Sequence, residues 1–215
     1  MGMAAVPFGV DINKVKEVFG CGDKELFEKI KSANLYHNYA SQTDNFDKIL
    51  EDIFFNYTKP EDRKPTTGFW SFKKSNIGSG LNENKGHAYG YALIVICDHL
   101  GSHLLPEWDG FYYGKVFKAA VNIMKEKGLR LDLEDMFEPH EVFDIPKIAD
   151  FPAINLFNKR DIEHINAVMN NVEINESEAD TNKIDYDEVQ AMLKDIRDSF
   201  KTCKERNVEM VTFTH

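Results

Sequence analysis

The densest group of side chains that could carry chemistry lies between positions 87 and 103. Its members are His87, Tyr89, Tyr91, Asp98, His99 and His103. A histidine oriented by an aspartate can act as a general base, so His87 with Asp98, helped by Tyr89 or Tyr91, is one hypothesis for a catalytic site. The two are about three helical turns apart, so they meet only if His87 folds back over the helix. We favour the simpler interpretation, in which Asp98 and His99 are exposed near a helix C-terminus and His99 interacts with its dipole.

The same stretch contains two histidines at the spacing that helical zinc sites use. His99 and His103 are four positions apart, but Gly101 lies between them and is expected to end the helix. No third ligand follows nearby, and the chain has no Gly-x-Ser-x-Gly, Walker or Gly-x-Gly-x-x-Gly sequence. We therefore predict no metal site and no bound cofactor.

The three cysteines, Cys21, Cys97 and Cys203, are far apart and lack Cys-x-x-Cys spacing. They predict buried free thiols in a reducing compartment, and neither Cys97 nor Cys203 has the basic neighbours that activate a thiolate. The first residues form no signal peptide, and no stretch approaches the roughly 18 apolar residues of a membrane span. A cytoplasmic protein without a membrane partner is expected.

The charge balance restricts the partners. With 26 basic and 36 acidic residues, the formal net charge is −10, which disfavours nucleic acids and anionic membranes. It permits a basic protein partner. Six carboxylates form an acidic stripe: Asp132, Glu134, Asp135, Glu138, Glu141 and Asp144. Such runs are usually solvated faces, but this one can also dock a basic partner.

Aromatic residues in irregular segments supply the candidates for a binding surface. These are Trp70, Trp108, Tyr112 and Tyr113. Aromatic side chains in loops can line a pocket or an interface, although we expect at least half of them to fill the core.

The elements that must position these residues are mostly helices. Ala4–Val10 predicts an edge strand or extended arm broken by Pro7, and 208–213 predicts a closing strand. Helical periodicity and caps predict helices that start after Asp11 and Asp23 and others at about 44–57, 87–100, 115–127, 161–171 and 186–206.

Three segments lack such periodicity. Residues 58–86 predict a long irregular loop, which would serve as a lid in the enzyme hypothesis, and 173–184 an acidic flexible insertion. Residues 129–158, with three prolines, are expected to wrap the surface. The whole chain, 1–215, is therefore predicted to be a single helix-dominated α+β domain whose small sheet pairs the N- and C-terminal strands.

Three stretches of the chain carry a resemblance. They are GVDINKVKEVFGCGDKELFEKI, GYALIVICDHLG and SFKTCKERNVEMVTFTH. In this order they resemble an uncharacterised bacterial domain-of-unknown-function family, and both ends are similar to the YfbM-like proteins, another uncharacterised bacterial group. The resemblance implies a bacterial or phage-type origin and a fold, but no activity and no functional residues.

Three functions are compatible with these observations, and one of them is a structural subunit of an oligomer, which would expose a large apolar surface on the monomer. The leading hypothesis is a cytosolic, non-enzymatic binding protein of immunity or regulatory type with an acidic interaction surface. Its alternative is a hydrolase-like enzyme for a small molecule, in which a His/Asp pair lies in a central pocket.

Overall fold

The computed structural model describes residues 2–41, 43–63, 78–106, 109–172 and 186–215. The described chain divides into two compact units. The sheet unit comprises Met1–Asp11, Gly101–His140 and Ala153–His215, and the helical unit comprises Ile12–Leu100 and Glu141–Pro152. Half of the predicted loop 58–86 and the predicted insertion 173–184 lie outside the described residues. A single domain over 1–215 stays a prediction.

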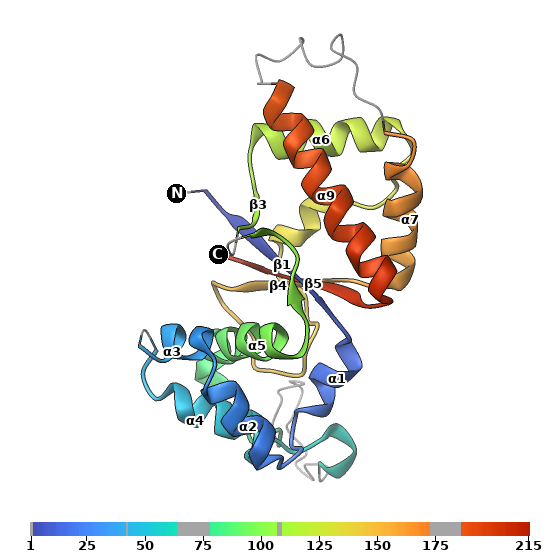
Figure 1. Ribbon diagram of the computed structural model, residues 1–215. Coiled ribbons are helices and arrows are strands. Elements are labelled where there is room, and N and C mark those ends of the chain that lie inside the picture. The colour runs from blue at the N-terminus through green and yellow to red at the C-terminus, as the bar shows by residue number, and fades with distance from the viewer. Residues whose placement is uncertain (1, 42, 64–77, 107–108, 173–185) are drawn as a thin grey trace, which may run out of the picture. The chain divides into compact units, whose positions relative to one another are not determined.

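The sheet unit is built on the two chain ends, as predicted. β1 (Ala4–Val10) runs antiparallel to β5 (Glu209–Thr214), with Val6 opposite Phe213, and β4 (Ala153–Phe157) pairs with the other side of β5 (Figure 1). The short strands β2 (Ser102–His103) and β3 (Phe111–Tyr112) pair with the remaining side of β1. With helices around this antiparallel sheet, the α+β class is confirmed.

β1 is not an edge strand, contrary to the prediction. The strand order is β2-β1-β5-β4, so β1 has neighbours on both sides. Pro7 is tolerated there because its carbonyl accepts from Leu104 N (3.0 Å) on the β2 side, away from β5. In an antiparallel pair the N–H and C=O of one residue point to the same side, so the missing N–H removes no bond to β5.

Within the described part of this unit, three helices pack together: α6 (Lys115–Glu126), α7 (Lys159–Met169) and α9 (Tyr186–Arg206). α9 lies against both α6 and α7 and contacts β1 and β5 (Figure 1). Asn158 and Asp161 form a capping box that starts α7, and the buried Asn166 amide donates to Phe200 O at 2.9 Å, which ties α7 to α9. Among the described residues, no helix combines the length and apolarity needed to cross a bilayer.

The expectation that 129–158 only wraps the surface is wrong. This stretch contains a 3-10 turn, Leu133–Phe137, with buried residues, and it contains β4. The Thr214 hydroxyl donates to Met136 O at 2.8 Å, which fastens the turn to β5. The strand escaped prediction because its residues are nearly all buried and show no polar–apolar alternation.

The helical unit contains five α-helices within the described residues. They are α1 (Ile12–Glu17), α2 (Lys24–Lys31), α3 (Asn34–Ala40), α4 (Phe46–Glu51) and α5 (Gly86–Leu100). α5 is buried over most of its length and contacts each of α1–α4, as expected for a helix that is apolar on all sides. The predicted helix 44–57 is an α-helix only to Glu51 and continues as a π-helical segment, Asp52–Asn56.

Two glycines fasten this π-helical segment. Gly20 N donates to Ile53 O at 2.8 Å, and Gly22 N donates to Phe54 O at 2.9 Å. Carbonyls near a helix end lack partners within the helix, so these bonds cap it. Both glycines have φ +67°, but a Cβ at Gly20 would lie 2.7 Å from Tyr57 O, whereas one at Gly22 would meet nothing within 4 Å. The loop therefore approaches Tyr57 closely at Gly20.

This difference makes the two glycines a matched pair for mutation. Gly22→Ala should cost only the left-handed backbone conformation, about 1–2 kcal/mol of the free energy of unfolding. Gly20→Ala should cost roughly 1–3 kcal/mol more, because the methyl group collides with backbone. Urea unfolding of both variants measures the difference. Equal losses would show that the close approach to Tyr57 is unimportant.

Candidate functional site

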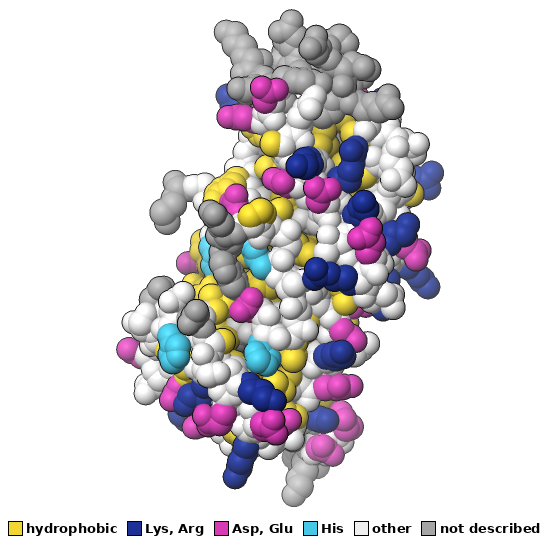
Figure 2. Space-filling view, in the orientation of Figure 1, with side chains coloured by type: hydrophobic (Ala, Val, Ile, Leu, Met, Phe, Trp, Pro, Cys, Tyr) yellow, Lys and Arg dark blue, Asp and Glu magenta, His cyan; other side chains and the backbone are white. Residues whose placement is uncertain are grey.

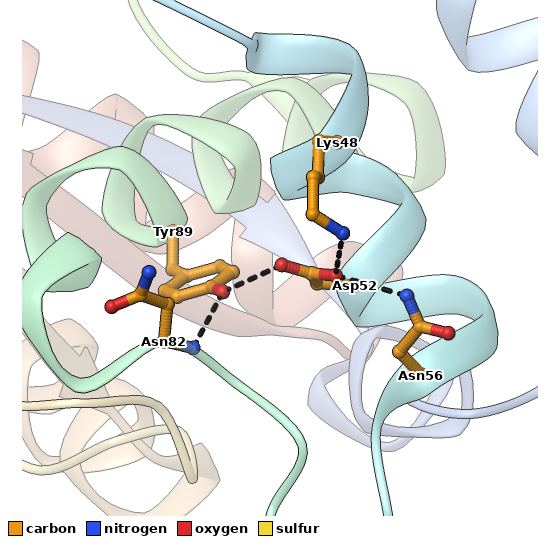
Figure 3. A network of polar contacts seen from close by, with 5 residues as sticks. All are labelled: Lys48, Asp52, Asn56, Asn82 and Tyr89. Carbon is orange, nitrogen blue, oxygen red and sulfur yellow. Dashed lines mark hydrogen bonds and ion pairs between the residues drawn. The ribbon is translucent and has the colours of Figure 1, made fainter.

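A buried carboxylate connects the π-helical segment to α5. The side chain of Asp52 accepts hydrogen bonds from Tyr89 Oη (3.0 Å) and Asn56 Nδ2 (2.9 Å) and forms an ion pair with Lys48 Nζ at 3.3 Å (Figure 3). The residue is only 6% exposed. A charge this deep is tolerated only when it is paired and hydrogen-bonded, so the three donors explain its presence.

The Tyr89 hydroxyl extends this network to the segment before α5. While it donates to Asp52, it accepts from Asn82 N at 2.9 Å. Burial, together with the bond to Asp52, raises the pKa of the Tyr89 phenol to about 12, against the opposing effect of the Asn82 N–H. The phenol therefore stays protonated at neutral pH and holds Asn82, next to Glu83, in place.

The chain leaves the π-helical segment at Tyr57. Thr58 N then donates to Ser79 O at 2.7 Å, and Ser79 is buried. A Cβ at Gly80, which has φ +82°, would lie 2.1 Å from Asn56 O, so only glycine allows this approach. These contacts hold the chain that follows the π-helical segment against Ser79 and Gly80.

A cavity of about 1000 Å³ lies in the helical unit beside these residues. Three aromatic rings, which we call its floor, pack together: the Phe19 and Tyr57 centroids are 5.0 Å apart and edge to face, and Phe19 and Phe143 are stacked at 6.3 Å. Phe19 and Phe143 are buried. A cavity of this size with an apolar floor is typical of a ligand site.

Charged groups of both signs surround the floor. Among the described lining residues, the carboxylates are Glu17, Glu61, Glu83, Glu141 and Asp144. The ammonium groups are Lys16, Lys59 and Lys147. Five carboxylates lie with three lysines, and Arg63 is paired with Asp144, so the described lining keeps a small excess of negative charge, which favours a ligand with positive charge.

One of these carboxylates, Asp144, takes part in both a hydrogen bond and an ion pair. Its Oδ2 accepts from Tyr57 Oη at 2.5 Å and forms an ion pair with the Arg63 guanidinium, whose Cζ lies 5.4 Å from the Tyr57 ring centroid. We call Tyr57 and Asp144 the corner. Burial raises the pKa of Tyr57, and its bond to Asp144 raises it further, so the phenol remains a donor. Burial alone would lower the pKa of Arg63, but Asp144 raises it overall.

The predicted catalytic pair does not come together. His87 is exposed and Asp98 half-buried on the same continuous helix, α5. At 1.5 Å per residue they are about 16 Å apart along the axis, beyond hydrogen-bonding reach. Tyr91 is half-buried, with its ring stacked on Tyr39 at 5.2 Å. None of the three is among the described residues that line the cavity.

The predicted binding aromatics have separate surroundings. Tyr112 is 56% exposed in β3. Tyr113 is half-buried, donates to Glu134 at 3.0 Å and lies beneath Lys118 Nζ at 4.6 Å. Trp70 and Trp108 lie outside the described residues. In the sheet unit, Tyr112 is therefore exposed, whereas the Tyr113 side chain is engaged by Glu134 and Lys118.

The acidic stripe is divided between the two units. Asp132 and Glu134 belong to the sheet unit and form ion pairs with Lys125 (3.5 Å) and Lys118 (3.9 Å), whereas Glu141 and Asp144 line the cavity. On the face drawn in Figure 2, acidic and basic side chains are interspersed. Each unit therefore carries one part of the stripe.

The cysteines are free, but their burial differs from the prediction. Cys97 and Cys203 are buried, whereas Cys21 is exposed. Burial, reinforced by Asp98, raises the pKa of Cys97, and burial raises that of Cys203 to about 12, so neither thiol ionises readily. Among the described residues, no group of three or more His, Cys, Asp and Glu side chains could hold a metal ion.

Sequence reasoning missed the residues that build the cavity. Phe19 and Tyr57 have the spacing of core residues on helices, Arg63 lies in an irregular segment, and Asp144 resembles a solvated charge. They come together from three distant parts of the chain. The only signal was the irregular composition of 58–86, which contains Arg63 and Glu83.

Removing one hydroxyl tests the buried network. Tyr89→Phe leaves the Asp52 carboxylate and the Asn82 N–H each without this partner, so the free energy of unfolding should fall by about 1–3 kcal/mol. Tyr112→Phe, which removes an exposed hydroxyl, should change it by less than about 0.5 kcal/mol. Chemical denaturation of both variants measures the two changes in the free energy of unfolding. Equal effects would contradict a structural role for the network.

Alkaline pH should weaken the same network. Because the pKa of Tyr89 is raised from 10.0 to about 12, its stabilising effect is present below pH 10 and lost as the pH rises towards 12. Between pH 10 and pH 12, ionisation of Tyr89 should lower the free energy of unfolding by about 1.4 kcal/mol per pH unit. In Tyr89→Phe the pH slope, measured by denaturation, should be shallower by this amount. An unchanged slope would contradict the assignment.

Comparison with known proteins gives a family but no function. No curated protein and no solved structure shows significant similarity to the chain. The family model of a domain of unknown function, DUF7691, matches residues 78–215, which is more than half of the chain. The matched part includes Tyr89 and Asp144 but not Tyr57 or Arg63. The chain therefore belongs to the DUF7691 family of domains of unknown function.

Proposed function

We propose that the protein is a non-enzymatic binding protein of regulatory or immunity type, whose cavity in the helical unit accepts a positively charged segment of a protein partner. The observation that carries this proposal is the cavity of about 1000 Å³ with its aromatic floor and its excess of carboxylates. The net charge of −10 also favours a basic partner, because it attracts positive charge over a distance.

The chemistry at the cavity supports binding over catalysis. Tyr57 holds its proton firmly, and the Asp144 carboxylate already accepts from Tyr57 and Arg63. Such a bonded pair can position a ligand, whereas His87 and Asp98, the groups expected to act as a base, are not among the described residues that line the cavity. The alternative, a hydrolase-like enzyme, has His87 and Asp98 on different turns of α5 and draws no support from this cavity.

Three further features belong to the same proposal. We infer a cytoplasmic location, which the free cysteines support. A bacterial origin and a kinship to the YfbM-like proteins rest on the sequence resemblance. We expect neither nucleic acid nor membrane among the partners, because a net charge of −10 repels both.

Paired charge substitutions test the site. Glu83→Gln with Glu141→Gln removes two cavity carboxylates, and Glu163→Gln with Glu188→Gln makes the same charge change on exposed sites of the sheet unit. The probe is a fluorescent peptide of alternating glycine and arginine or lysine, measured by anisotropy at about 0.05 M and about 0.3 M salt. The cavity variant should bind about tenfold more weakly, and the control within about twofold of wild type.

Two results would overturn the proposal. Equal weakening in both double variants would show attraction to net charge alone. No binding at either salt concentration would remove the basic segment as a ligand.

A further inference from the structure

We propose that the corner of Tyr57 and Asp144 is an arginine-recognition site, occupied in the free protein by the chain's own Arg63 and, on binding, by an arginine of the basic partner. This inference rests on the proposed function, because it names the side chain by which the partner enters the cavity.

The contacts of Arg63 define the recognition chemistry. Its guanidinium forms an ion pair with the Asp144 carboxylate, its Nε donates to Thr58 O at 3.0 Å, and its Cζ lies 5.4 Å from the Tyr57 ring centroid. A carboxylate, a carbonyl acceptor and an aromatic face together match a planar cation with several donors. A lysine ammonium has neither the plane nor the fork of donors, so the corner should distinguish the two.

The corner does not depend on Arg63 for its shape. Tyr57 packs edge to face on Phe19 and directly follows the π-helical segment, while its hydroxyl donates to Asp144 at 2.5 Å. Thr58 is held by its bond to Ser79. The carboxylate, the carbonyl and the ring therefore remain in place for another guanidinium if Arg63 leaves.

We infer that Arg63 can be exchanged, because the two residues that hold it border the cavity. Its side chain is 17% exposed, and Tyr57 and Asp144 both line the cavity. An internal group competes with a ligand as if present at an effective concentration on the order of millimolar. Arg63 therefore lowers the apparent affinity for a partner's arginine, and removing it should raise that affinity about tenfold.

The experiment uses the full chain and two capped tripeptides, Gly-Arg-Gly and Gly-Lys-Gly, titrated by calorimetry. Arg63→Ala should bind the arginine peptide about tenfold more tightly than wild type does, and the lysine peptide more weakly than the arginine peptide by a similar factor. Adding Asp144→Asn should abolish the gain. Arg160→Ala, on an exposed site of α7, is the control with the same loss of charge and should bind like wild type.

A second measurement covers the case in which Arg63→Ala folds poorly. Methylguanidinium, but not methylammonium, should raise the melting temperature of this variant by several degrees and leave Arg160→Ala unchanged. In Arg63→Lys, which keeps the charge, methylguanidinium should raise the melting temperature by a smaller amount.

The outcomes separate this inference from the proposed function. If Arg63→Ala binds the arginine peptide no more tightly than wild type, or if both peptides bind equally, the corner is not an arginine site. The cavity can then still bind the longer basic peptide through Glu83 and Glu141. If no variant binds any basic peptide, both proposals fail.

Discussion

The buried carboxylate of Asp52 is the constraint on which the helical unit depends. A charge in a poorly polarisable environment must be compensated by several donors at once. Lys48 on α4 and Asn56 on the π-helical segment lie four residues before and after Asp52, whereas Tyr89 comes from α5. The Tyr89 hydroxyl in turn accepts from Asn82 N. Satisfying one buried group therefore fixes the π-helical segment relative to α5 and to the chain just before it.

The cavity follows from this arrangement. Because the π-helical segment ends at Tyr57, the position of Asp52 determines where the Tyr57 ring and hydroxyl lie. Gly20 and Gly22 cap the same segment and bring the neighbouring Phe19 against Tyr57. Asp144 then receives the Tyr57 hydroxyl and the Arg63 guanidinium. Structural and binding groups thus form one continuous set of contacts, in which buried groups position the half-buried ones.

Sequence patterns predicted the elements that are stabilised locally. The strand at each chain end and the helices α2, α6, α7 and α9 carry caps or amphipathic periodicity, and the structure contains them. β4 and α3 depend on tertiary contacts and were missed, whereas the π-helical segment lies within the predicted helix 44–57 and only its type was not foreseen. The cavity was missed for the same reason, since Phe19 has the spacing of a core residue and Asp144 that of a solvated charge. Only the folded chain brings them together.

The central claim is that the cavity of the helical unit, and not the rest of the acidic stripe, binds a basic partner. Amide chemical shifts of the ¹⁵N-labelled protein, followed while an arginine-rich peptide is added, test it most directly. We expect shifts concentrated in residues 13–19, 57–63 and 141–147, which contain most of the cavity lining. Shifts concentrated instead around Leu133–Phe137, with those three segments unchanged, would contradict it.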